Sequence, residues 1–367
     1  MFREDFVWGV ASSAYQVEGT DAADGRGACV WDMFAADGRV FEHQNAGTSC
    51  DHMHHYKEDI ALMKHLGIRA YRVSLNWARM LPEGTGRVNE NASAMYRDMI
   101  LTMKENGITP YLTLFHWEFP QALYERGGWQ NPDVVQWFGE YAKVVAENFS
   151  DICEYFITIN EPQCVVGLGH LSGVHAPGVK LPVAQTFLVA HHLLMAHGQA
   201  VINLRRYAVR PVKIGFAPTG GVAYPYTDRP EDIEAAKKVY FGFYNPIDNW
   251  TWNVSWFSDP VFLGHYPEEG LKKFAPYLPE ITQEDMELIY QPLDFMGQNI
   301  YNGYYVRAGA DGEPEFVDRA PGFPKTGSDW PVTPEAFYYG IKFLTERYPL
   351  PLYITENGMS CHDLVSS

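Results

Sequence analysis

Residues 154–162 read EYFITINEP, and this stretch decides the fold. From Tyr155 to Ile159 the run is rich in aromatic and β-branched residues and does not alternate with polar ones. Such continuity is typical of a strand covered on both faces, as in a parallel sheet. The run stops at Asn160 and Glu161, so a polar pair follows directly where the predicted strand ends.

The same type of run recurs along the chain. The other runs are FVWGVA (6–11), AYRVSL (70–75), TPYLTLF (109–115), VKIGFA (212–217), LDFMGQNI (293–300) and PLYIT (351–355). Segments with helical periodicity separate them, the clearest at 50–67, 131–150 and 182–206. Repeated strand–helix units predict an α/β fold with a parallel sheet, either doubly wound or closed into a (β/α)8 barrel.

The boundaries of these elements follow from local signals. Asn131 and Pro132 predict the cap and first turn of one helix, and Gly67 predicts the end of another. The stretches 17–50 and 218–262 are expected to be irregular loops above the sheet. Because no linker rich in Pro, Gly or Ser divides the chain, we expect residues 1–367 to form a single catalytic domain.

Composition excludes several classes of protein. The net charge of −17 and the pI near 5.1 disfavour binding to nucleic acid or to anionic lipid. The five cysteines are scattered without a CxxC pair, which argues against a disulfide framework and a zinc site. The sequence begins without a signal peptide and has no apolar run of roughly 20 residues, so a cytoplasmic location is expected. His52 and His55 are expected on a solvated helix face, not at a metal.

Polar side chains gather where the predicted strands end. The C-terminal ends of barrel strands open onto one cavity, which is where barrel enzymes place their catalytic groups. The polar and aromatic residues at these ends are Gln16, Glu18, Arg72, Asn76, Trp77, His116, Trp117, Glu118, Asn160, Glu161, Glu356 and Asn357. Taken singly, Gln16 and Asn160 are ordinary strand-end amides, His116 is a buried histidine, and Arg72 is half of an ion pair. Together they indicate a catalytic face.

Glu161 and Glu356 form the most informative pair. Each follows an apolar strand, each lies beside an asparagine, and the predicted strands are the fourth and the seventh. Two carboxylates that face each other across a barrel mouth at about 5 Å suit a retaining glycosidase, with one as acid/base and the other as nucleophile.

Seven segments of the chain together resemble the family 1 glycoside hydrolases, the β-glucosidase family, over nearly the whole length. They are FVWGVASSAYQVEG, YRVSLNWARMLP, FHWEFPQAL, ITINEP, GVHAPG, DFMGQNIYNGYYV and YITENG, in the family's order. The resemblance implies an eight-stranded β/α barrel that hydrolyses terminal β-linked sugars with retention and without a metal or organic cofactor.

The resemblance also implies roles for individual residues. Glu161 corresponds to the general acid/base and Glu356 to the nucleophile. Arg72 and Tyr301 correspond to the residues that support the nucleophile. The residues implied to bind substrate are Gln16, His116, Trp117, Asn160, Asn299, Tyr301 and Trp330, of which Trp330 resembles the platform for the leaving group.

Three positions depart from the family pattern. Gln163 stands where Trp is common, Glu118 replaces the usual Asp after His-Trp, and Ile300 replaces a common Tyr. These positions lie mainly on the leaving-group side or in supporting roles, so they leave the aglycone preference open.

The end of the sequence differs most from the family. The resemblance implies a further helix, strand and helix after Glu356, but eleven residues remain. We therefore expect an incomplete barrel with about seven of eight βα units, as in a fragment without its closing unit. The alternatives are a 6-phospho-β-glucosidase of the same family, a non-catalytic relative, or a split form that needs a complementing C-terminal segment. The preference among glucoside, galactoside and fucoside, and the oligomeric state, stay open.

Overall fold

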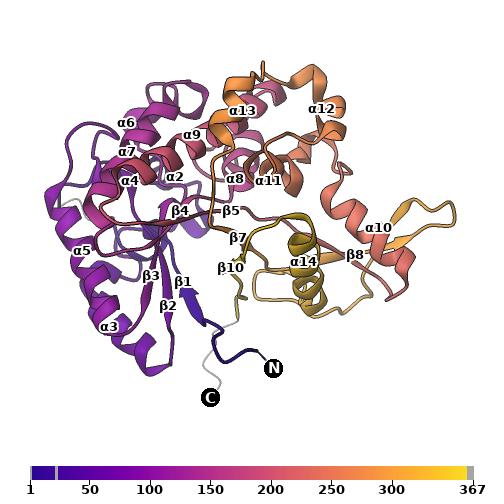
Figure 1. Cartoon of the computed structure of the whole chain (residues 1–367), viewed down its shortest axis with the longest axis horizontal. Coiled ribbons are helices and arrows are strands. Elements are labelled where there is room, and N and C mark those ends of the chain that lie inside the picture. The colour runs from indigo at the N-terminus through magenta and orange to yellow at the C-terminus, as the bar shows by residue number, and fades with distance from the viewer. Residues whose placement is uncertain (1, 21–23, 362–367) are drawn as a thin grey trace.

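The computed structural model describes residues 2–20 and 24–361. Its main sheet is parallel and has seven strands in the order β1-β2-β3-β4-β5-β7-β10 (Figure 1). Their bounds are β1 (Gly9–Ala11), β2 (Ala70–Ser74), β3 (Thr109–Phe115), β4 (Tyr155–Asn160), β5 (Lys213–Ala217), β7 (Phe295–Asn299) and β10 (Leu352–Glu356).

The strand order decides between the two predicted architectures. In a doubly wound sheet the order reverses at a switch point. Here each strand of the main sheet pairs with the next one of that sheet along the chain, and β1 and β10 approach each other at the two ends of the sheet. The sheet therefore curls into a nearly closed barrel, which confirms the predicted α/β barrel with about seven of its units. Among the described residues, no ladder joins β1 to β10.

Helices connect the strands and cover the sheet. The longer ones are α3 (His52–His65), α5 (Glu90–Glu105), α7 (Val134–Phe149), α9 (Val183–Tyr207), α10 (Pro230–Phe241), α11 (Val254–Phe262) and α14 (Pro334–Arg347). The shorter ones are α1 (Ala14–Val17), α2 (Val30–Ala36), α4 (Trp77–Met80), α6 (Gln121–Tyr124), α8 (Pro162–Cys164), α12 (Glu268–Phe274) and α13 (Gln283–Ile289). Short 3₁₀ turns occupy Phe41–His43, Gly128–Gln130, Ile247–Trp252 and Ala275–Tyr277, and Val165–Leu171 forms a π-helix.

The prediction of irregular loops at 17–50 and 218–262 was wrong. The first stretch contains α2, and the second contains α10, α11 and strand β6 (Val222–Pro225). β6 joins β8 (Gly303–Ala308) and β9 (Pro314–Val317) in a small second sheet. Pro230 occupies the first turn of α10. The buried face of α10 packs on this second sheet, so the helix depends on strands β8 and β9, which lie far away in the sequence.

One helix detail agrees with expectation and one differs. Just before α7, Asn131 has an extended backbone and its side chain accepts a hydrogen bond from the Asp133 amide at 2.9 Å, as predicted for a helix cap. His52 is buried, not solvated, and its Nδ1 lies 2.6 Å from Asp59 Oδ2. His55 is exposed, as expected for a solvated helix face.

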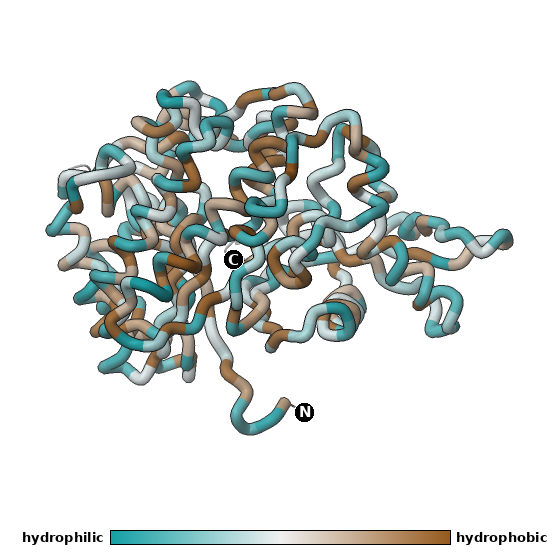
Figure 2. The backbone as a smooth tube through the Cα atoms, turned by 45° about the horizontal axis from the view of Figure 1, so that its top comes forward, coloured by the Kyte–Doolittle hydropathy of each residue, from teal (hydrophilic) through white to brown (hydrophobic). Residues whose placement is uncertain are grey.

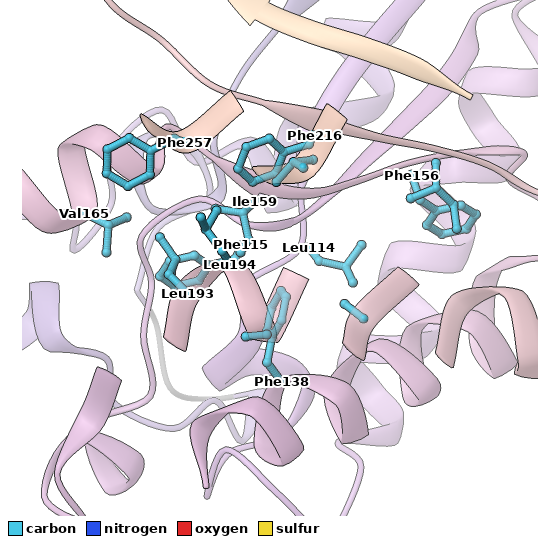
Figure 3. Packing of buried hydrophobic residues seen from close by; sticks show 14 of the residues in the cluster. Leu114, Phe115, Phe138, Phe156, Ile159, Val165, Leu193, Leu194, Phe216 and Phe257 are labelled. Carbon is cyan, nitrogen blue, oxygen red and sulfur yellow. The ribbon is translucent and has the colours of Figure 1, made fainter. Parts of the chain in front are cut away.

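The core lies between the barrel strands and the helices around them. Figure 3 shows Phe115 and Phe216, from two strands, in one group with Phe138 of α7 and Leu193 of α9, and Phe156 of β4 set apart from them, all of them buried. These large side chains fill the barrel wall, and their burial is the main source of stability.

Strand β1 is the exception to this burial. All three of its residues are exposed, although the run that contains them predicted a strand covered on both faces. β1 has one hydrogen-bonded neighbour, β2, and lies at the edge of the sheet. The segment before it leaves the body of the molecule (Figure 2), and its rings Phe2, Phe6 and Trp8 pack mainly on one another.

No helix in residues 2–20 or 24–361 combines the length and the apolar character needed to cross a bilayer.

Candidate active site

The end of β4 carries Glu161 on a sharp turn. Glu161 has a φ of 45°, in the left-handed region that residues other than glycine rarely adopt, and Pro162 follows in the first turn of α8. Its amide donates to the carbonyl of Ala217 at 2.8 Å, which ties the turn to β5. A π-helix begins at Val165, a feature frequent at functional sites. The Glu161 side chain is thus held at the barrel rim by a constrained backbone.

The end of β10 carries Glu356, which has two charged or polar donors. Arg72 Nη1 donates to Glu356 Oε1 at 2.6 Å, and the Tyr301 hydroxyl donates to Glu356 Oε2 at 2.6 Å. The Arg72 Nε also donates to Thr113 Oγ1 at 2.9 Å, which fixes the guanidinium. Both oxygens of the Glu356 carboxylate therefore face donors that favour its ionised form.

Two asparagines connect the surroundings of the two carboxylates. Asn299 Nδ2 donates to Glu161 Oε1 at 2.7 Å and to Asn160 Oδ1 at 3.0 Å. Asn160 Oδ1 also accepts from Arg72 Nη2 at 2.7 Å. Glu161 and Glu356 thus belong to one continuous hydrogen-bonded cluster at the C-terminal ends of β4, β7 and β10. The predicted separation of about 5 Å between the two carboxylates stays a prediction.

The donors in this cluster also fix the orientation of both amides. Asn160 Oδ1 is an acceptor because Arg72 can only donate to it, so the Asn299 atom that contacts both Asn160 Oδ1 and Glu161 is the nitrogen, and Thr355 Oγ1 donates to Asn299 Oδ1 at 2.7 Å. Asn160 Oδ1 accepts from both Arg72 and Asn299, so its nitrogen is the atom that faces His116. The network leaves no freedom to exchange oxygen and nitrogen in either side chain.

His116 takes a defined tautomer as a consequence. Asn160 Nδ2 donates to His116 Nε2 at 3.1 Å, and burial lowers the pKa of His116 to about 4. The neutral ring must therefore carry its hydrogen on Nδ1. That atom is buried and has no hydrogen-bond partner among the described residues. A buried donor without a partner is costly, and a ligand hydroxyl would satisfy it.

The two carboxyl groups are shifted in opposite directions. Burial raises the pKa of Glu161, and the negative charge of Glu356 raises it further, against the lowering effect of Asn299, Cys164 and Arg72. Burial alone would also raise the pKa of Glu356, but the charge of Arg72 and the hydrogen bond from Tyr301 outweigh it, so that pKa lies below its ordinary value. The surroundings thereby move the two pKa values apart, that of Glu161 upward and that of Glu356 downward.

The remaining predicted residues lie around this cluster. The indole of Trp117 donates to the Asn160 carbonyl at 3.1 Å from a backbone with a φ of 86°. Trp330 is about half exposed and contacts the Tyr301 ring edge-on at 5.3 Å. Gln16 lies in α1 with an exposed side chain, and among the described residues no hydrogen bond joins that side chain to the cluster.

Sequence reasoning missed two residues that contact the site. Cys164 Sγ donates to Glu161 Oε2 at 3.0 Å, and Thr355 orients Asn299. Both stand within three residues of a carboxylate that the sequence did identify, at spacings where a turn or a strand end brings the side chains together. Local spacing was therefore the available signal.

The positions that depart from the family pattern have defined surroundings. Gln163 is fully buried, and its Oε1 accepts from the Thr219 amide at 3.2 Å. Glu118 is buried and accepts from the Tyr15 amide at 2.8 Å, which links the end of β3 to α1. Ile300 is buried in the core. Within the described ranges, no group of three His, Cys, Asp or Glu side chains is placed to hold a metal ion.

Comparison with known proteins agrees with this geometry. The family model described as glycosyl hydrolase family 1 matches residues 1–367. Beta-glucosidase A of Thermotoga maritima is 41% identical over all of this chain and 80% of its own. The 1,4-beta-D-glucan glucohydrolase of Thermotoga neapolitana is 40% identical over all of this chain and 84% of its own. A solved structure of the T. maritima beta-glucosidase with glucoimidazole superimposes with a TM-score of 0.87, 40% identity, and coverage of 100% of this chain and 80% of that one.

Proposed function

The chain belongs to glycosyl hydrolase family 1 and is an O-glycosyl hydrolase of the β-glucosidase type, and we propose that it cleaves terminal β-glucosides by double displacement with retention. In this proposal Glu356 is the nucleophile and Glu161 is the general acid/base. The observation that carries it is the opposite shift of the two carboxyl pKa values within one hydrogen-bonded cluster.

The first step uses both groups at once. A Glu356 oxygen forms a bond to the anomeric carbon while the bond from that carbon to the leaving-group oxygen breaks, and the proton of Glu161 moves to that oxygen. Arg72 and Tyr301 keep Glu356 ionised and aimed before the attack. The product of this step is a glycosyl ester on Glu356.

The second step follows from the change of charge. The ester of Glu356 is neutral, so the negative charge that raised the pKa of Glu161 in addition to burial disappears. Glu161 then accepts a proton from water as the water oxygen attacks the anomeric carbon, and the ester bond breaks. Two inversions at one carbon give net retention, and both carboxyl groups return to their starting states.

The surrounding residues suit a sugar in this position. We propose that Asn160, Asn299 and the Nδ1 donor of His116 bind sugar hydroxyls, with Trp117 beside them. For Gln16 the same role rests on the family resemblance alone. Trp330, which is exposed beside Tyr301, is proposed to contact the leaving group. The relatives named above are glucosidases and a glucan glucohydrolase, which favours an unphosphorylated glucoside over the 6-phosphate alternative.

Two further proposals concern the chain as a whole. We propose that residues 1–367 act as one catalytic domain, because the seven strands from β1 at the start of the chain to β10 near its end form one sheet whose strand ends build the site. A cytoplasmic location stays a prediction, supported by the five cysteines, all of which are free thiols.

Trapping of the glycosyl ester tests the proposed function. An aryl 2-deoxy-2-fluoro-β-glucoside slows the second step, and we expect it to label Glu356 in a peptide identified by mass spectrometry. Proton NMR of an ordinary aryl β-glucoside reaction should show the β-anomer of glucose first. A label on another residue, or the α-anomer formed first, would contradict the proposal.

A further inference from the structure

Cys164 occupies an unusual place beside the acid/base carboxylate. Its Sγ lies 3.0 Å from Glu161 Oε2, and its side chain is buried. The left-handed turn at Glu161 causes this contact, since the Cys164 amide returns to the Glu161 carbonyl at 3.0 Å. The thiol is therefore placed on the carboxylate by the same backbone turn that presents the carboxylate to the barrel mouth.

The two oxygens of Glu161 have partners of different kinds. Oε1 accepts from Asn299 Nδ2, which is fixed as a donor because it also donates to Asn160 Oδ1, an acceptor of the Arg72 guanidinium. Oε2 faces a thiol, which is a weak donor and can also act as a weak acceptor. The amide thus favours the carboxylate strongly at one oxygen. The thiol fits both states at the other, because its hydrogen can point at the carboxylate or turn away from a protonated oxygen.

We propose that Cys164 is a positioning residue that sets the proton affinity of Glu161, donating its S–H to Oε2 when Glu161 is ionised and releasing that oxygen when Glu161 is protonated. This proposal rests on the proposed role of Glu161 as acid/base. It adds a residue that stabilises the base form needed for the second step and does not trap the proton needed for the first.

The other groups around Glu161 leave this role to the thiol. Glu356 of β10 opposes ionisation, Arg72 of β2 favours it, and the Tyr301 hydroxyl is committed to Glu356. Burial raises the pKa of Cys164 well above its ordinary value, so the group that faces Glu161 is a neutral thiol across the working range.

The side of Cys164 that faces away from Glu161 borders neutral groups in the described part of the chain. Its side chain lines a small cavity of about 20 Å³ together with Trp31, Trp117, Val165, His170 and His175. Burial lowers the pKa of His170 to about 4 and lowers that of His175, so both rings are neutral near pH 7. The cavity has room for about one water molecule, so a smaller or equal side chain at position 164 fits without clash.

The first test is the pH profile of kcat/KM for an aryl β-glucoside with a poor leaving group, which requires the acid. Cys164→Ala removes a donor to the ionised form, so the alkaline limb should move up by about half a unit to one unit. Cys164→Ser restores a stronger donor, and its limb should return to the wild-type position or below. A dinitrophenyl β-glucoside needs no acid, and its alkaline limb should not move.

Cys153→Ala provides the matched control. Cys153 is also a buried thiol, but its Sγ lies 3.4 Å from the carbonyls of Pro110 and Tyr155, away from the cluster. A purely structural role of Cys164 would lower activity without moving the limb, as Cys153→Ala is expected to do. Equal limbs in Cys164→Ala and wild type, or shifts of Ala and Ser in the same direction, would overturn the proposal.

Infrared spectroscopy gives a readout that does not depend on turnover. The S–H stretch assigned by its loss in Cys164→Ala should shift as Glu161 ionises, and this shift should be absent in Glu161→Gln. A band that does not change with pH would overturn the role of Cys164. A further outcome separates this proposal from the proposed function. If Glu161→Gln lost equal activity toward the poor and the dinitrophenyl leaving group, while the S–H band of the wild type still shifted with pH, the proposed function would fail and the thiol contact would stand.

Discussion

The rims at the ends of β4 and β10 place the same type of side chain in two different environments. At the end of β4, Glu161 is held by an amide and a thiol, and the cation Arg72 bonds directly to Glu356 instead. At the end of β10, Glu356 receives a guanidinium and a phenol directly. Burial acts on both in the same direction, so the bonded partners are what separates the two carboxyl pKa values.

Removal of the Glu356 charge should have the largest effect. Glu356→Gln keeps the size of the side chain but cannot attack, and we expect turnover to fall by at least about 10⁴-fold. Azide should restore activity to Glu356→Gly and give the glycosyl azide of inverted configuration, identified by NMR. Normal turnover in Glu356→Gln would contradict the role of Glu356 as nucleophile, and with it the division of roles between Glu161 and Glu356.

Removal of the Glu161 proton should have a smaller effect that depends on the leaving group. In Glu161→Gln, kcat/KM for an aryl glucoside with a poor leaving group should fall by about 10²–10⁴-fold, the usual size of general acid catalysis. For a dinitrophenyl glucoside the same parameter should change little, because the leaving group needs no proton. An equal loss for both substrates would assign Glu161 a role other than acid.

Loss of the Arg72 charge should make the two rims more alike. In Arg72→Met, burial of Glu356 loses the largest effect that opposes it, so its pKa should rise by about one to two units and the acid limb of kcat/KM should move up equally. Arg72→Lys keeps the charge and should move the limb less. Because Arg72 also bonds Asn160 and Thr113, thermal unfolding checks that both variants fold. An unmoved limb in folded Arg72→Met would contradict this account of Glu356.

Glu118 tests whether burial alone raises a carboxyl pKa near this site. Burial raises the pKa of Glu118 to about 8, although the Tyr15 amide lowers it and the Glu18 charge is a lesser term. A folded pKa above the unfolded value of 4.5 contributes stability that is complete below pH 4.5 and is lost as pH rises through about 8.

Relative to Glu118→Gln, the wild type should therefore lose roughly 2–4 kcal/mol of unfolding free energy between pH 5 and pH 8. Denaturant unfolding at both pH values measures this difference. Glu105→Gln, at an exposed position with the same change of net charge, is the control. A parallel response of both variants would show that Glu118 ionises without cost.

The sequence predicted the barrel because its signals are local. Continuous apolar runs mark β2 to β5, β7 and β10, and the polar residues that follow them meet at one rim because parallel strands end on the same side. The pairing of Arg72 with Glu356 came from the family resemblance, since the two are 284 residues apart. The structure brings these two together as expected.

The features that sequence reasoning missed depend on contacts across the fold. Helix α10 and strand β6 are stabilised by a second sheet whose other strands come after residue 302, so their own stretch looked irregular. β1 looked like a covered strand, but its exposure depends on how many neighbours it has. Cys164 reaches Glu161 through a left-handed turn that no residue type announces.

The central claim is that one carboxyl group of the pair is protonated while the other is ionised. Carbon-13 NMR of the protein with labelled glutamate carboxyls measures this directly. Of the two coupled resonances, the one absent in Glu356→Gln should titrate below the ordinary range of a glutamate, and the one absent in Glu161→Gln should titrate above it. In the fluoroglycosyl ester, the Glu161 titration should move to lower pH. The reverse order, or no movement in the ester, would contradict the account.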